Sequence, residues 1–269
     1  MWIPRWLGES YAKLYAEFDL GLFRFSDAVR VLELSESMAK AVVSGLHRHG
    51  LLTIFERRRP RTYRLISPES FILLASGEVR KVEILQERYL ELIYACFRAL
   101  RKIISLKSLA VYGSVARGTA SENSDLDLLV VSGDFKGSIG RRIELLVRTV
   151  CADVKDELRF LRSYGYNASI SFYPLKPSEV EKLPIILLDL VEDARIVYDE
   201  NEFLKGILLK LKHRLAEMGA RRVRTKRGWY WDLKPDLKPL ELRRGFQNGL
   251  ERRLGLWLRP LQSSPQRGR

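Results

Sequence analysis

Two aspartates, Asp125 and Asp127, enter an apolar run in the stretch "SDLDLLVV". Successive side chains of a strand point to opposite faces, so these two carboxylates share one face while Leu126 and Leu128 share the other. Held about 6–7 Å apart at a strand end, they repel each other at neutral pH, and a divalent cation would reverse that cost. Because Mg²⁺ prefers oxygen ligands and needs only one or two carboxylates beside substrate phosphates, the pair predicts a metal–nucleotide site.

A glycine–serine turn precedes the aspartates by ten residues. Gly113 removes the side chain where a phosphate would approach the backbone, and Ser114 offers a hydroxyl. If a short helix begins in "SVARG", its free N–H groups point at the same anion. Arg117 either contacts phosphate or pairs with a nearby carboxylate. We therefore predict Gly113, Ser114 and Arg117 as phosphate ligands, and Asp125 and Asp127 as catalytic metal ligands.

The segments around this turn alternate between strands and helices. Strands are expected at 109–112, 126–131, 168–173 and in "ARIVYD", with helices over 141–164, 178–191 and up to Met218. Such alternation predicts an α/β (α+β) domain with a mixed sheet flanked by helices. We place this domain at 78–233, including a long linking helix over 78–104 and a basic hairpin at 220–233. The aromatic residues of this hairpin either stack bases or pack against the core. Residues 234–269 are expected to form a basic, partly disordered tail.

Residues 1–77 have the element order of a winged helix-turn-helix. Helices are expected at 10–18, at 25–34 with Ser26 as the N-cap, and at 35–50, followed by strands "LLTIF" and "RTYRL". If this module binds DNA, the third helix presents its outer face to the major groove and the wing arginines meet phosphates. Winged helices also serve as docking or dimerisation modules, so a protein-binding role for residues 1–77 stays open beside DNA binding. The predicted nucleic-acid contacts are Lys40, Ser44 and His47 of the helix and Arg57, Arg58, Arg59, Arg61 and Arg64 of the wing.

Charge is concentrated near the C-terminus. Of 269 residues, 47 are basic and 33 acidic, and residues 201–269, with 18 basic and 6 acidic residues, contribute +12 of the net +14. This excess indicates either a polyanionic or acidic partner or a solvated surface. Cys96 and Cys151 lie in apolar segments and are predicted as buried thiols, which suits a reducing cytoplasm. No stretch is apolar enough for a membrane span. The abundance of Arg, Lys and Glu is typical of thermophiles, and an oligomeric assembly stays open.

The stretch "GSVARGTASENSDLDLLVV" resembles the active-site signature of the DNA polymerase beta-like nucleotidyltransferase superfamily, in its minimal nucleotidyltransferase branch. The layout is similar to archaeal members with an N-terminal winged helix-turn-helix. The resemblance implies that Gly113 and Ser114 hold a nucleoside triphosphate and that Asp125 and Asp127 bind Mg²⁺ or Mn²⁺. It also implies attack of an acceptor hydroxyl on the α-phosphate, with release of pyrophosphate.

One part of that family pattern is missing. Members commonly supply a third carboxylate from a later strand, which helps to bind metal and takes the acceptor's proton. The matching segment, "NASISFYPL", offers only Asn167, Ser169 and Ser171. Either another residue fills the role, or the metal lowers the acceptor's pKa unaided, or the protein binds nucleotide without efficient transfer.

These observations predict a Mg²⁺-dependent nucleotidyltransferase that moves a nucleoside monophosphate, AMP from ATP in the first instance, onto a hydroxyl. Similarity to antitoxins that adenylylate a helical partner toxin favours a protein acceptor; RNA and small molecules stay open. The alternative is a DNA-binding transcriptional regulator whose nucleotidyltransferase core binds nucleotide with little or no transfer.

Overall fold

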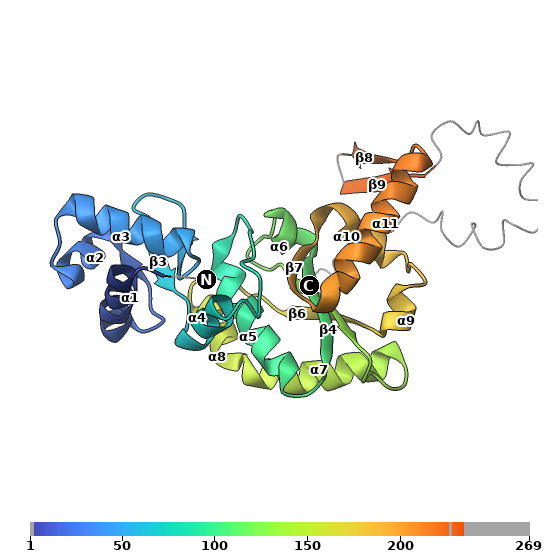
Figure 1. Cartoon of the computed structure of the whole chain (residues 1–269), viewed down its shortest axis with the longest axis horizontal. Coiled ribbons are helices and arrows are strands. Elements are labelled where there is room, and N and C mark those ends of the chain that lie inside the picture. The colour runs from blue at the N-terminus through green and yellow to red at the C-terminus, as the bar shows by residue number, and fades with distance from the viewer. Residues whose placement is uncertain (1–2, 226–227, 234–269) are drawn as a thin grey trace, which may run out of the picture.

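The N-terminal part of the chain combines three helices with a small antiparallel sheet (Figure 1). In this computed structural model, which describes residues 3–225 and 228–233, the strands pair in the order β1-β3-β2. Ser35 caps α3 by accepting a hydrogen bond from Met38 N. Ser26, predicted as the cap of α2, lies inside that helix instead, and Asp27 accepts from the backbone N–H of Arg24. The elements are α1 (Arg5–Phe18), β1 (Phe23–Arg24), α2 (Phe25–Leu32), α3 (Glu36–Arg48), β2 (Leu52–Glu56) and β3 (Thr62–Leu65).

The predicted long helix over 78–104 is wrong. A helix that was not predicted, α4 (Pro68–Ala75), begins after the N-cap Ser67 and is followed by Gly77 at φ +76°. The chain then runs without helix to a 3₁₀ turn, η1 (Glu87–Tyr89), and α5 (Leu90–Arg101). Arg80 N donates to Val197 O on a distant strand and Val82 N donates to the Tyr94 hydroxyl, so tertiary partners replace the hydrogen bonds of a helix.

A four-stranded mixed sheet forms the centre of the molecule. Its order is β6-β5-β4-β7, with β4 antiparallel to β5 and β7, and β5 parallel to β6. Leu126, Leu128 and Val130 of β5 lie in one apolar cluster and Leu129 and Val131 in another, so both faces of the sheet are covered. The strands are β4 (Leu106–Tyr112), β5 (Leu126–Ser132), β6 (Ile170–Leu175) and β7 (Arg195–Asp199).

Helices cover the two faces of this sheet separately (Figure 1). One face packs against α5, α7 (Ile139–Asp153) and α8 (Lys155–Ser163), so the single helix predicted over 141–164 is interrupted at Val154. The other packs against α9 (Pro177–Val180), α10 (Ile186–Asp193) and α11 (Phe203–Glu217). The helix predicted over 178–191 breaks because Pro184 disfavours helical backbone at Leu183, which adopts φ +53°.

The predicted C-terminal hairpin is present as β8 (Arg221–Thr225) and β9 (Gly228–Asp232). Both cysteines are free, Cys96 buried and Cys151 half-buried. No helix among the described residues is long and apolar enough to cross a membrane. The predicted tail over 234–269 lies outside the described residues.

A buried ion pair ties the N-terminal part to the helices behind the sheet. Arg64 of β3, 3% exposed, donates from both terminal nitrogens to the carboxylate of Glu157 on α8, and its guanidinium lies 3.6 Å from the Phe160 ring centroid. The same apolar cluster contains Leu14 of α1, Phe55 of β2 and residues of α5, α7 and α8. The two parts of the chain therefore share one continuous core.

Candidate active site

The two predicted catalytic aspartates lie at the end of β5 on the sheet face covered by α10. Asp127 pairs in register with Tyr112 of β4 and with Ser171 of β6, so these three side chains form one row across the sheet. Asp125 precedes the strand by one residue and is exposed, whereas Asp127 is half-buried. The alternation of strand side chains thus places both carboxylates on the same face, as the sequence predicts.

Gly113 connects β4 to the short helix α6 (Gly113–Arg117) at φ +72°. A Cβ built on this residue would overlap Oδ2 of Asp127 and lie 2.9 Å from its Cγ. The position therefore requires glycine for two reasons, the left-handed backbone and the carboxylate packed against its Cα. Ser114 occupies the first turn of α6, directly beside this contact.

Serines of β6 and of the segment before it hold the two aspartates. The Ser169 hydroxyl donates to Asp125, and the hydrogen bond from Ser171 lowers the pKa of Asp127. Asn167 instead donates to Asn123 Oδ1 at 3.0 Å in the loop before the aspartates. Ser169 and Ser171, in the segment where the family pattern would place a third carboxylate, therefore orient the existing pair.

Electrostatics at this edge of the sheet favour a cation. Burial, together with the charge of Asp125, raises the pKa of Asp127 to about 6 against the opposing hydrogen bond from Ser171. A bound divalent ion would favour the ionised form and remove the repulsion. Within 3–225 and 228–233, no three His, Cys, Asp or Glu side chains gather as a complete metal site. Two carboxylates suit an ion that takes its other ligands from substrate phosphates and water, so the donor set fits Mg²⁺ or a similar hard cation.

Arg117 lies between the sheet aspartates and α10. Its Nη1 is 3.5 Å from Oδ2 of Asp193, whose pKa is lowered by Arg222 and Arg117 against the effect of burial. The Arg117 charge also opposes the rise that burial causes in the pKa values of Asp127 and Asp189. Of the two predicted roles, pairing with a carboxylate is the one observed.

Two acidic residues of α10 were not predicted as part of the site. Asp189 is half-buried on α10, which packs against α6, and burial raises its pKa against the charges of Arg117 and Arg222. Asp193 lies one helical turn further along. The spacing of these aspartates at i and i+4 in "LLDLVED", beside buried Leu187 and Leu190, was the signal available in the sequence.

The N-terminal residues predicted to bind nucleic acid fall into two groups. Arg57 donates to Leu85 O and to Glu87, and His47 Nε2 lies 2.9 Å from Glu87 Oε2, so both side chains are engaged by protein partners although Arg57 is exposed and His47 is partly exposed. Arg64 is buried with Glu157, so its predicted contact with phosphate is wrong. The second group is exposed and forms no ion pair among the described residues; it consists of Lys40, Ser44, Arg58, Arg59 and Arg61.

The family model of the nucleotidyltransferase domain matches residues 93–204, the range that contains the aspartates and α10. The chain is 33% identical over 107 residues to "Putative protein adenylyltransferase MJ1305" of Methanocaldococcus jannaschii, covering 40% of this chain and 68% of that protein.

Two solved structures show a weaker likeness. A mutant toxin–antitoxin MntA–HpeT structure aligns with a TM-score of 0.30 at 16% identity over 46% of this chain and 88% of that one. A toxin–antitoxin structure with AMP-PNP aligns with a TM-score of 0.30 at 16% identity over 46% of this chain and 90% of that one. These two likenesses are too low to support any inference about activity or partner. The domain match and the archaeal relative are sufficient by themselves: the chain belongs to the polymerase beta-like nucleotidyltransferase family and is an enzyme of the nucleotidyltransferase type.

Proposed function

We propose that this protein transfers AMP from ATP to a hydroxyl group of a partner protein in a Mg²⁺-dependent reaction. The observation that carries the proposal is the packing of Asp127 against Gly113, beside Asp125 and at the start of α6. The relative's name, which specifies protein as the acceptor of the adenylyl group, supports a protein hydroxyl.

Separate residues of the site would bind the cation and the triphosphate. Asp125 and Asp127 would hold the cation, while Gly113, Ser114 and Arg117 would bind the triphosphate. A bound divalent ion supplies neutralisation of the charge on the entering and leaving oxygens. The acceptor oxygen forms a bond to the α-phosphorus, and the bond from that phosphorus to the pyrophosphate oxygen breaks.

We propose Asp189 as the group that takes the acceptor's proton. It belongs to α10, which packs against α6, and β6 itself carries no carboxylate. Burial raises the pKa of Asp189 against the charges of Arg117 and Arg222, which makes it a stronger base than an exposed carboxylate.

To test the proposal, the full chain is incubated with labelled ATP, Mg²⁺ and a lysate, and label on protein is followed. Asp125→Ala with Asp127→Ala should abolish transfer. Asp156→Asn, an exposed carboxylate on α8 paired only with Arg159, is the matched control and should transfer like the wild type. Undiminished transfer by the double variant would sink the assignment, and label on RNA or a small molecule would correct the acceptor class.

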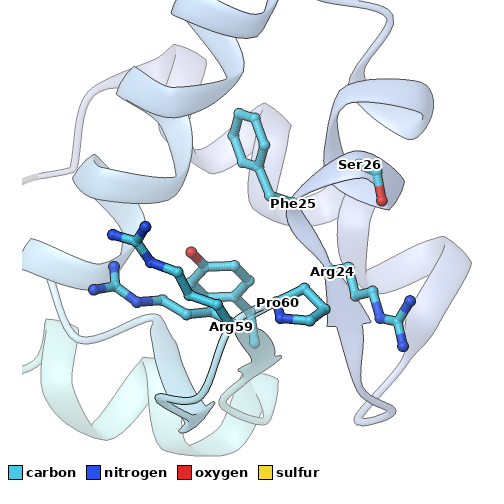
Figure 2. A pocket seen from close by; sticks show the side chains of 7 residues that line it. Arg24, Phe25, Ser26, Arg59 and Pro60 are labelled. Carbon is cyan, nitrogen blue, oxygen red and sulfur yellow. The ribbon is translucent and has the colours of Figure 1, made fainter.

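A second candidate function is nucleic-acid binding by residues 3–77, proposed as a winged helix-turn-helix. A hollow of about 430 Å³ beside the β2–β3 turn favours it. Arg24 and Arg59 lie on opposite sides of Pro60, with Phe25 above them in Figure 2. Among the described residues, Arg24, Arg59 and Arg61 of this lining form no ion pair, so their charges are available to phosphates. In this reading the protein is a DNA-binding regulator with a weakly active core.

Binding to the DNA upstream of the protein's own coding sequence tests this second candidate. Arg59→Ala plus Arg61→Ala should weaken binding and lower the slope of log affinity against log salt by about 0.9 for each phosphate that is no longer neutralised. Arg159→Ala, 72% exposed on α8, is the control for the removal of a surface charge. An unchanged slope in the double variant would exclude this hollow as the DNA-binding surface.

A further inference from the structure

Arg117 shares its carboxylate partner with a residue of the C-terminal hairpin. Arg222 of β8 donates from Nη1 to Oδ1 of Asp193 at 3.0 Å and from Nη2 to Oδ2 at 2.6 Å, a two-pronged ion pair. Arg117 reaches only Oδ2, at the longer distance of 3.5 Å. Asp193 is 14% exposed, so little water competes for its charge. Arg222 therefore satisfies most of the bonding capacity of Asp193 and leaves Arg117 loosely held.

The hairpin is fixed in place by further contacts of the same face. Trp231, opposite Arg222 in the β8–β9 register, donates from Nε1 to Leu188 O of α10 at 3.1 Å. The Arg222 guanidinium lies 3.8 Å from the Trp229 ring centroid. A cation stacked on an aromatic ring and bonded to a carboxylate has few alternative positions. The hairpin thus presents Arg222 to Asp193 in a defined geometry.

Loss of Arg222 would change the ion pairing of Arg117. Arg117 belongs to α6, which contacts both β5 of the sheet and α10, and it lies 3.5 Å from Asp193. With Arg222 removed, Asp193 would keep an unpaired charge in a poorly solvated position, and Arg117 is the other guanidinium within ion-pair distance. A two-pronged pair between Arg117 and Asp193 would turn the Arg117 head group away from an incoming phosphate.

We infer that the C-terminal hairpin is part of the nucleotide site: Arg222 is a positioning residue that occupies Asp193 so that Arg117 stays available to the triphosphate. This inference rests on the proposed function, because it assumes that Arg117 binds the triphosphate. It assigns to the hairpin a role other than base stacking or simple core packing. The effect acts on the phosphates, so it is the same for nucleotides with different bases.

The test measures equilibrium binding of non-hydrolysable ATP and GTP analogues with Mg²⁺ by calorimetry, using the full chain. Arg222→Ala should weaken both analogues about tenfold, which corresponds to about 1.4 kcal/mol. Adding Asp193→Asn to Arg222→Ala should restore binding to within about twofold of the wild type, since the competing charge is gone. Arg224→Ala, an exposed arginine of the same strand, is the matched control and should bind normally.

A double variant that binds as weakly as Arg222→Ala would show that Arg222 acts through hairpin stability alone, which overturns the inference. Normal binding by Arg222→Ala overturns it as well. If Arg222→Ala fails to fold, Arg222→Lys, which keeps the charge but not the two-pronged geometry, should show a partial loss that Asp193→Asn again relieves; a loss without relief contradicts the inference. Failure of the wild type to bind either analogue would refute the proposed function itself, and the inference with it.

Discussion

Replacing Gly113 by alanine tests the central contact of the site. The new Cβ would overlap Oδ2 of Asp127, so the carboxylate must retreat by more than about 1 Å, and a misplacement of that size costs about 100-fold in rate. That factor corresponds to about 2.7 kcal/mol of transition-state stabilisation. In addition, a side chain at φ +72° costs about 1–2 kcal/mol of folding free energy.

Gly77→Ala separates the two effects. Gly77 has φ +76°, and a Cβ there meets no heavy atom within 4 Å, so this variant carries the backbone cost without the collision. Urea unfolding gives the stability of both variants, and labelled AMP transfer gives their rates. We expect Gly77→Ala to lose stability and keep its rate, and Gly113→Ala to lose both. Transfer by Gly113→Ala within twofold of Gly77→Ala would refute the placement of the Asp127 carboxylate at the reacting centre.

Three further predictions concern other carboxylates. Asp189→Asn should lower kcat about 100-fold and leave the affinity for an ATP analogue within twofold, because a base acts on the acceptor and not on the nucleotide; an equal loss in affinity would assign Asp189 to nucleotide binding instead. In metal-free protein the pKa of folded Asp127 is about 6, above its value in the unfolded chain. As the pH falls from about 6 to 4, the folded state therefore takes up a proton before the unfolded state does, and this uptake stabilises the folded state. The stability deficit of the wild type relative to Asp127→Asn, about 1–3 kcal/mol at pH 7.5, should therefore shrink by pH 4.5, and a pH-independent deficit in urea unfolding would contradict it. Glu157→Gln should destabilise the protein by about 3–5 kcal/mol because it leaves Arg64 charged and buried, and adding Arg64→Met should recover part of that loss; thermal unfolding of both variants decides this.

The sequence by itself determined the local features of the site. Period-two alternation put Asp125 and Asp127 on one face of β5, and glycine at position 113 marked the turn that receives them. Helical spacing located α3, and strand composition located the C-terminal hairpin. These features depend on neighbours within a few positions of the chain, so residue type and spacing are sufficient to predict them.

The tertiary structure decided which charged residues are buried. Arg58 and Arg64 are both arginines near the predicted wing, yet Arg58 is exposed and Arg64 lies in the core, because Glu157 reaches Arg64 from 93 positions away. The segment 78–86 has helical spacing but is extended, since Val197 and Tyr94 offer it hydrogen-bond partners. Likewise, Asp189 and Asp193 join the site only because α10 packs beside α6. Burial and partner choice depend on residues that are distant in the chain, and no local pattern specifies which of them will meet.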